Sequence, residues 1–237
     1  MARMRRLVVP GYPHHVTQRG NRRMKTFFTD EDYQYYLDLV AEVKCDVGVE
    51  VWAYCLMPNH THLIVVPQFE DSLSRLFRVV HRHYTRRINF REKWKGHLWQ
   101  ERFHSFVMDE SYLLAAVRYV ELNPVRARLC DSAKDWRWSS AAAHLKNKDN
   151  AVVSVRPMLD RVSDWLAYLN GANNGVQLEN IRQHSRTGRP AGGDAFVAEL
   201  EELTGESLQR KKPGPKKKEI VVQLGQNVLE HVLKKRS

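Results

Sequence analysis

The pattern of hydrophobic and polar residues predicts β-strands in four segments of the chain, by alternation in the first and by apolar, β-branched or aromatic content in the others. The first segment is 13–19, PHHVTQR, which ends at the polar sequence GNRR. Residues 49–57 are rich in β-branched and aromatic side chains, a Pro-Asn dipeptide predicts a turn, and residues 60–66 form a returning strand. Residues 98–108, LWQERFHSFVM, make the last segment. We therefore expect one β-hairpin and two further strands.

Three other segments repeat their apolar residues every three or four positions, which predicts amphipathic helices. The first begins at a capping box of Thr29 and Asp32 and is stopped by Gly48. The second spans about 72–89, and the third spans about 110–122 and stops before an Asn-Pro dipeptide. The order is then β-α-β-β-α-β. It predicts the α+β class, with a ferredoxin-like (RRM-like) antiparallel sheet, extra helices and a basic C-terminal extension.

The composition changes after residue 150. We expect residues 1–150 to form the main domain, 151–175 a helical extension and linker, and 176–237 a basic DNA-binding appendage that is partly disordered. Helices are predicted over 156–170 and, as a short amphipathic helix, over 194–204. The sequence HSRTGRPAGG before the last helix has the composition of a linker, and RKKPGPKKK after it is too polar to fold alone.

The charge narrows the functional classes. The chain has 38 Lys and Arg against 27 Asp and Glu, a formal net charge of +11. A protein this basic usually binds a polyanion, most often nucleic acid, and the alternative is a solvated basic surface without a partner. No apolar run reaches roughly 18 residues, so we expect no membrane partner. Three scattered cysteines without a CxxC pair indicate reduced thiols and a cytoplasmic location.

Two histidines stand at the beginning of the predicted returning strand, in the sequence NHTHLIV. Because side chains alternate across a strand, His60 and His62 project from the same face and could jointly bind a divalent cation. The alternative is a pair of hydrogen-bonded histidines without a metal. A structural zinc site would require four ligands, typically closely spaced cysteines, and that pattern is missing. The pair therefore favours an open site, as a catalytic metal requires.

Several segments together resemble one known family. They are NHTHLIV, GHLWQERFHS, YVELNPVRARL and WRWSSA, in this order, after the opening HHVTQRGNRR. The chain resembles the HUH single-tyrosine transposases, which are IS200-like, in the branch associated with repetitive extragenic palindromes (REP). The resemblance spans about residues 1–145. One departure is Thr61, where the wider superfamily usually has a bulky hydrophobic residue between the histidines; we expect it to affect strand packing rather than chemistry.

The resemblance implies an activity. It implies a metal-dependent endonuclease and strand transferase that cuts single-stranded DNA at hairpin-forming palindromic repeats through a 5′-phosphotyrosine intermediate. It places the nucleophile at Tyr119 and the metal, Mg²⁺ or Mn²⁺, on His60 and His62, with Asn123 as a third ligand. From the residues alone, a packing role is favoured for Tyr119, and an asparagine before proline is also an ordinary helix end. Tyr84 is a rival nucleophile, although it lies on the apolar stripe of its helix.

Single-stranded, hairpin-forming DNA is the partner that the resemblance implies. A basic ridge along the helix 72–89 predicts phosphate contacts, with a solvated face as the alternative. The sequences TGRP and KPGPKKK resemble minor-groove arms. Several aromatic residues could stack bases or belong to the core; they are Trp94, Trp99, Phe103, Trp136 and Trp138. The predicted DNA-binding residues are Arg19, Asn21, Arg22, Arg75, Arg78, Arg82, Arg86, Arg102, Arg118, Arg126, Arg189, Lys216, Lys217 and Lys218.

Two other functions compete with strand transfer. One is a non-catalytic nucleic-acid-binding protein on the same fold, which the missing aromatic ribonucleoprotein motifs disfavour. The other is a regulatory protein that has lost mobility. No P-loop is present, so we expect neither ATP nor another small-molecule substrate. We expect a monomer, with a dimer as the alternative, in the cytoplasm and associated with the nucleoid.

Overall fold

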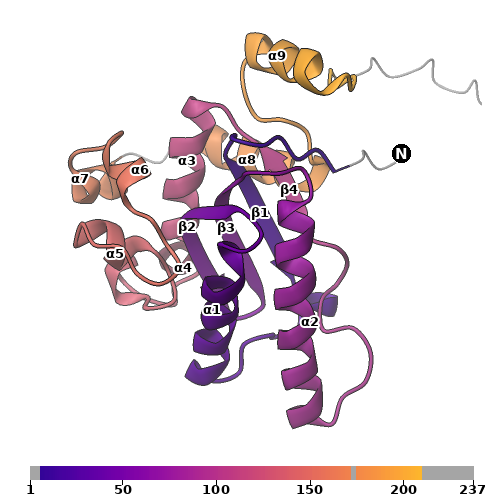
Figure 1. Cartoon of the computed structure of the whole chain (residues 1–237). Coiled ribbons are helices and arrows are strands. Elements are labelled where there is room, and N and C mark those ends of the chain that lie inside the picture. Colours follow the sequence, from indigo (N-terminus) through magenta and orange to yellow (C-terminus); the bar gives the residue numbers. More distant parts are fainter. Residues whose placement is uncertain (1–5, 172–174, 210–237) are drawn as a thin grey trace, which may run out of the picture.

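The computed structural model describes residues 6–171 and 175–209, and in it four antiparallel strands form one open sheet (Figure 1). The strands are β1 (His14–Arg19), β2 (Val49–Met57), β3 (His60–Pro67) and β4 (His104–Val107), in the order β2-β3-β1-β4. β2 and β3 form the predicted hairpin, and β1 pairs with both β3 and β4. With one helix before β2 and another before β4, this arrangement confirms the predicted α+β, ferredoxin-like class.

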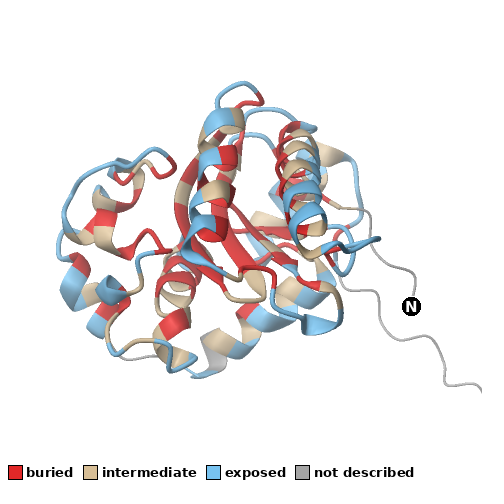
Figure 2. Ribbon diagram, turned by 90° about the horizontal axis from the view of Figure 1, so that it is seen from below, coloured by how far each residue is buried: buried red, intermediate tan, exposed pale blue. Residues whose placement is uncertain are grey.

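Helices cover both faces of the sheet. α1 (Asp30–Lys44) and α2 (Ser72–Glu92) pack on one face, whereas α3 (Glu110–Glu121) and α8 (Gly175–Thr187) pack on the other. Strand residues alternate between the two cores, so that Leu63 lies in the core under α1 and α2 and Ile64 lies under α3. Figure 2 shows the buried strands between helices whose outer surfaces are exposed.

The two helices on the first face form where the sequence predicts them. The carboxylate of Asp32 accepts hydrogen bonds from the backbone N–H groups of Phe28 (2.9 Å) and Thr29 (3.2 Å), which completes the N-terminal cap of α1. α1 ends at Lys44, and the chain turns through Gly48 at φ +64°. The apolar stripe of α2 is buried as predicted. Tyr84 belongs to it and donates its hydroxyl hydrogen to the carbonyl oxygen of Thr26 (2.8 Å), which makes it a packing residue.

Three predictions of secondary structure are wrong in extent. β4 begins only at His104, because residues 98–102 bond instead to the end of β1 as a loop: Gln100 N donates to the carbonyl of Arg19 (2.9 Å). The predicted helix 156–170 is two short helices, α6 (Arg156–Leu159) and α7 (Trp165–Asn170). Asp164 caps a new helix there by accepting from Ala167 N (2.9 Å).

The third is the predicted linker HSRTGRPAGG, whose first four residues continue α8. α8 contacts α3, β4 and β1, so the predicted C-terminal appendage begins with a helix packed on the sheet. The short helix α9 (Asp194–Thr204) has the predicted bounds. Two further one-turn helices are α4 (Asn123–Arg126) and α5 (Ala141–Leu145). Within residues 6–171 and 175–209, no helix combines the length and the apolar character needed to cross a membrane.

Candidate active site

The two histidines of β3 project from the sheet face that α3 and α8 cover. β1 lies beside β3 in a register that pairs Thr17 with His62 and Arg19 with His60. The imidazole ring centroids of His60 and His62 are 4.9 Å apart, and the rings are nearly perpendicular. His62 is buried, with 6% of its surface exposed, and His60 is half-buried. The predicted pair on one face is therefore confirmed.

Hydrogen bonds fix the orientation of His60. Its Nδ1 lies 2.6 Å from Oδ1 of Asn59, and Nδ2 of Asn59 donates to the carbonyl oxygen of Arg23 (3.0 Å). Because the amide nitrogen must face that carbonyl, the amide oxygen faces His60, and Nδ1 of His60 must carry the proton. Nε2 of His60 then keeps its lone pair. This is the tautomer in which a histidine can ligate a metal through Nε2.

His62 has a different partner. Its Nδ1 lies 2.9 Å from Nε2 of His15 on β1, while its Nε2 is buried without a hydrogen-bond partner among the described residues. Burial lowers the pKa of His62 well below the usual 6.5, and burial together with the charge of Arg19 lowers the pKa of His60 to about 4. Both imidazoles are therefore neutral at physiological pH, the form that binds metal ions. His62 has an unpaired Nε2, and the neutral ring of His60 beside it is half-exposed. These two side chains fit the binding of a divalent cation.

Tyr119 lies next to this pair. Its helix, α3, is capped by Asp109, whose carboxylate accepts from the N–H of Tyr112 (2.9 Å), and the helix buries the apolar stripe predicted for it. Tyr119 is off that stripe and half-buried. Its ring centroid is 5.6 Å from that of His62 and 6.3 Å from that of His15, with both rings edge-on to it. The phenol of Tyr119 thus lies next to the neutral imidazoles of His62 and His15.

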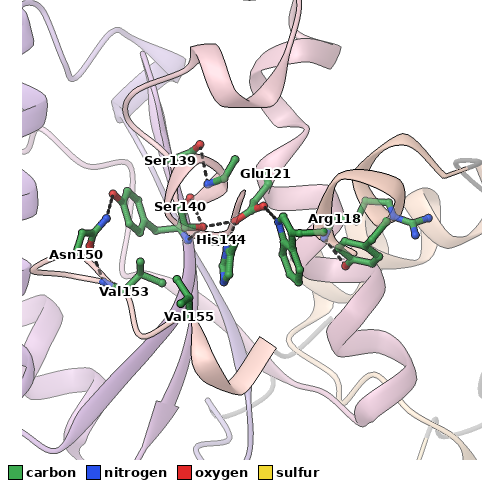
Figure 3. A network of polar contacts seen from close by, with 12 residues as sticks. Arg118, Glu121, Ser139, Ser140, His144, Asn150, Val153 and Val155 are labelled. Atoms are coloured by element: carbon green, nitrogen blue, oxygen red, sulfur yellow. Dashed lines mark hydrogen bonds and ion pairs between the residues drawn. The ribbon is translucent and has the colours of Figure 1, made fainter. Parts of the chain in front are cut away.

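A buried carboxylate anchors the end of α3 that carries Tyr119 (Figure 3). Glu121 is fully buried, and its Oε1 accepts hydrogen bonds from Ser140 Oγ (2.5 Å) and His144 Nδ1 (2.7 Å). Its Oε2 accepts from Trp165 Nε1 (2.9 Å). Ser140 belongs to the motif WRWSSA, so this motif acts by fixing the C-terminal end of α3. The position of Tyr119, two residues before Glu121, depends on that anchor.

Asn123, the predicted third ligand, is the first residue of α4, immediately beyond α3. Its amide Nδ2 is buried without a hydrogen-bond partner, and the residue does not line the cleft that contains the histidines. Among the described residues, no group of three His, Cys, Asp or Glu side chains is placed to hold a metal ion. A metal at this site would therefore need an amide, water or DNA oxygen beside the two histidines.

The cleft above the histidines measures about 630 Å³. Its lining comes from β1 and β3, from the loop 100–102, from Tyr119 on α3 and from α8. The backbone of Gly20 holds the rim together: its N–H donates to the carbonyl of Asn59 (2.8 Å), and a Cβ there would lie 2.3 Å from the carbonyl oxygen of Met24. The lining residues are Thr17, Gln18, Arg19, His60, His62, Gln100, Glu101, Arg102, His104, Tyr119, Glu179, Arg182, Ser185 and Arg186.

The structure brings some of the predicted DNA-binding residues to the cleft. Arg19 and Arg102 line it and are exposed. Asn21 and Arg22 follow β1 in a short 3-10 turn at the same end of the sheet, and Arg22 is exposed with a left-handed φ of +52°. Arg126 lies against Tyr119, with its guanidinium carbon 4.3 Å from the ring centroid.

Other predicted residues lie elsewhere. Arg118 stacks on the ring of Tyr168 (4.4 Å), and Arg189 donates to the carbonyl of Leu208 (2.7 Å). The basic ridge is on α2, which covers the opposite face of the sheet, and none of its arginines lines the cleft. The ridge consists of Arg75, Arg78, Arg82 and Arg86. Lys216, Lys217 and Lys218 lie outside the described residues.

Three residues at the site were not predicted from the sequence: His15, Arg182 and Arg186. His15 is buried beside His62, and its signal was the spacing of two between His15 and the cleft residue Thr17 on β1. Arg182 and Arg186 come from α8, four residues apart, and both pair with Glu179 (3.6 and 3.3 Å). Most of the aromatic residues that could have stacked bases belong to the core instead. Trp99, Phe103 and Trp138 are buried, whereas Trp94 is exposed.

Comparison with known proteins agrees with this geometry. Residues 9–123 match the family model described as "Transposase IS200 like". The chain is 25% identical over 141 residues to the REP-associated tyrosine transposase of Escherichia coli (strain K12), a match that covers 59% of this chain and 82% of that protein. A solved structure of a REP-associated tyrosine transposase bound to a REP hairpin aligns with a TM-score of 0.54 and 23% identity, over 65% of this chain and 92% of that one, which shows a shared fold.

The matched segment contains β1, the hairpin with both histidines, and α3 with Tyr119, and its last residue is Asn123. The two histidines of the cleft and the candidate nucleophile therefore lie within the segment that matches the family model. By this match, residues 9–123 are similar to the IS200-like transposases, and the chain shares the fold of a solved REP-associated tyrosine transposase.

Proposed function

We propose that this protein is a divalent-metal-dependent endonuclease and strand transferase for single-stranded DNA, and that it acts at hairpin-forming palindromic repeats. The observation that carries the proposal is the approach of Tyr119 to His62, with ring centroids 5.6 Å apart, inside a cleft lined by four arginines. That hairpin-forming repeats are the substrate is proposed from the similar proteins, which are REP-associated tyrosine transposases and include one solved in complex with a REP hairpin. The site of action is then the DNA of the nucleoid, in the cytoplasm.

The reaction assigns a separate task to each group. The Tyr119 phenol oxygen attacks the scissile phosphorus in line, the bond to the 3′-oxygen breaks, and that oxygen leaves as a 3′-hydroxyl after taking up a proton. The phenol proton passes to solvent, and the 5′-phosphate stays esterified to Tyr119. Held by His60 and His62, with Asn123 as the proposed third ligand, Mg²⁺ or Mn²⁺ would polarise the phosphate and neutralise charge that develops in the transition state.

The arginines hold the strand on either side of the attacked phosphate. Arg19 borders the cleft from the end of β1, Arg102 from the loop before β4, and Arg182 and Arg186 from α8. Such a concentration of cations attracts a polyanion and lets its backbone run past Tyr119 without sequence preference. Because one phosphodiester is exchanged for a phosphotyrosine, a different 3′-hydroxyl can attack that ester and regenerate the phenol. No nucleotide cofactor is needed for this exchange.

Replacement of the nucleophile tests the proposal. Hairpin oligonucleotides from the palindromic repeats near the gene, labelled at the 3′ end, are mixed with protein and Mn²⁺ and separated on a denaturing gel. The wild-type protein should shift the label to the size of the protein, and Tyr119→Phe should abolish that band while keeping DNA affinity. Tyr112→Phe, on the same helix, is the matched control and should keep the band. Persistence of the band in Tyr119→Phe, or tight binding by wild type without any adduct, would overturn the proposal.

A further inference from the structure

His15 makes one directional contact, and it is with His62. The two residues lie on neighbouring strands, one step diagonally apart, because His62 pairs directly with Thr17. The side chain of His15 is fully buried, its ring lies 5.1 Å from the His62 ring at an interplanar angle of 24°, and its Nε2 is 2.9 Å from Nδ1 of His62. Within residues 6–171 and 175–209, its other nitrogen, Nδ1, has no hydrogen-bond partner.

The 2.9 Å contact needs one proton between the two nitrogens, because both rings are buried and neutral. If His62 Nδ1 carries that proton, His62 Nε2 keeps a lone pair. If His15 Nε2 carries it, His62 Nε2 must carry a proton of its own and cannot bind a cation. The contact therefore decides whether His62 can act as a ligand.

The charge around the cleft favours the first arrangement. The cleft that contains His62 is lined by four arginines and two glutamates, so its lining has an excess of positive charge even though Glu179 pairs with two of the arginines; the charged residues are Arg19, Arg102, Arg182, Arg186, Glu101 and Glu179. A positive potential stabilises a lone pair that faces it and destabilises an N–H group whose positive end points toward it. Asn59 selects the same arrangement in His60 through an independent contact, so both histidines present an unprotonated Nε2.

We infer that His15 is a positioning residue, which holds His62 in the tautomer with a protonated Nδ1 and thereby leaves Nε2 free to bind a divalent cation. The inference deepens the proposed function and rests on it for the identity of the cation. His15 acts through His62 and is not itself a ligand: its Nε2 is engaged by His62, and the edge-on ring of Phe106 lies 5.2 Å away on another side.

The tautomer can be measured without metal, DNA or activity. Long-range ¹H–¹⁵N spectra of the full-length, metal-free protein distinguish a protonated from an unprotonated ring nitrogen. We expect His62 to be protonated on Nδ1 and His15 to be unprotonated on Nε2. Detection of His62 protonated on Nε2 in the wild-type protein would overturn the inference, whatever the variants do.

The consequence for the cation is tested with Mn²⁺ alone, by its paramagnetic resonance signal. His15→Phe keeps a ring but removes the acceptor, and we expect its Mn²⁺ affinity to fall by about tenfold or more. His15→Gln supplies an amide oxygen in place of Nε2 and should stay within about threefold of wild type. The matched control is His14→Gln, because His14 is buried on the same strand but contacts Tyr12 and Val9 instead, and it should leave Mn²⁺ affinity unchanged.

Failure of the inference and failure of the proposed function give different results. A folded His15→Phe protein that binds Mn²⁺ as tightly as wild type overturns the positioning role, even if Tyr119 is the nucleophile. A loss in His15→Phe that His15→Gln does not restore points to packing instead and also overturns it. If Tyr119→Phe still forms the adduct, the proposed nucleophile is wrong, yet the spectra still decide the role of His15.

Discussion

Arg126 covers one face of Tyr119, with its guanidinium carbon 4.3 Å from the ring centroid, and also donates a hydrogen bond to the backbone carbonyl of Tyr119. Its Nη1 is buried without a partner, and burial lowers the pKa of Arg126 below its ordinary value. A guanidinium so placed keeps the phenol in position and stabilises negative charge that develops on it. Sequence reasoning treated Arg126 as a DNA contact, whereas the structure joins it to the candidate nucleophile.

This contact gives a first prediction. Arg126→Gln removes the cation, and we expect single-turnover formation of the protein–DNA adduct to slow by about tenfold, because such contacts are worth roughly 1–2 kcal/mol. DNA affinity should change by less than about threefold, since Arg126 does not line the cleft. The rate is measured on a denaturing gel and the affinity by fluorescence anisotropy. An equal loss of adduct rate and DNA affinity would indicate that Arg126 contacts the DNA, as predicted from the sequence.

The second prediction concerns the cation. Mg²⁺ or Mn²⁺ should support adduct formation, and EDTA should stop it, because His60 and His62 offer neutral imidazoles on one side of the cleft. His62→Ala should remove the stimulation by either ion, while Thr61→Val, which faces the opposite core, should keep it. Undiminished adduct formation in EDTA would refute a metal role for the histidine pair.

A third prediction compares the arginines of α8, which line the cleft, with those of α2 on the opposite face of the sheet. Arg182→Ala with Arg186→Ala removes two charges from the cleft, and Arg78→Ala with Arg82→Ala removes two exposed charges from α2 on the other face. If each cleft arginine contacts one phosphate, the slope of log affinity against log salt should fall by about 1.4 for the first pair. We expect a smaller change for the second pair. Equal changes would mean that DNA crosses both faces.

A C-terminal truncation that leaves the cleft intact has to begin after α8. Deletion from residue 176 would remove α8 and with it one side of the cleft, so it cannot separate binding from chemistry. Residues 210–237 carry nine Lys and Arg against two Glu. Their deletion should weaken DNA binding and flatten its salt dependence, while adduct formation at saturating protein is retained. Complete loss of the adduct at saturation, in a folded truncated protein, would place part of the chemistry beyond residue 209.

The features of the site that depend on the repeat of a single strand or helix could be predicted from the sequence. The common face of His60 and His62 follows from strand alternation, and the burial of Tyr84 follows from the stripe of α2. The approach of Tyr119 to His62 depends on how α3 crosses the sheet, a tertiary contact that only the resemblance suggested. α8 has few apolar residues and follows a Gly- and Asn-rich stretch, so its helix depends on packing, as the burial of Ile181 shows.

Glu121 provides a further prediction, about stability. Its buried carboxylate accepts three hydrogen bonds, and hydrogen bonds to charged groups contribute about 1.5–3 kcal/mol each. Glu121→Gln leaves at least one of the donors unpaired, and we expect the free energy of unfolding to fall by about 2–4 kcal/mol. Glu110→Gln on the same helix is the control: its ion pair with Arg161 lies at the surface, so the change should stay below about 1 kcal/mol. Urea unfolding measures both, and similar values would mean that the network does not anchor α3.

The last prediction is the direction in which stability changes with pH. Burial lowers the pKa of His14 to about 4. As a neutral ring, His14 donates from Nδ1 to the carbonyl of Tyr12 (2.8 Å) and accepts at Nε2 from the N–H of Val9 (3.1 Å). Protonation of Nε2 would abolish the second bond. The unfolded chain takes up a proton near pH 6.5, whereas the folded protein resists it until about pH 4, so acid favours the unfolded state.

The contribution of His14 is therefore fully present above pH 6.5 and is lost as the pH falls toward 4, by an amount on the order of 3 kcal/mol. His14→Gln cannot titrate, and its free energy of unfolding should fall less steeply over this interval. His97→Gln, which replaces an exposed histidine, should follow the wild-type curve. Urea unfolding at intervals from pH 7 to 4 provides the comparison. A His14→Gln curve parallel to that of wild type would show that His14 takes up its proton in the folded protein as readily as in the unfolded chain.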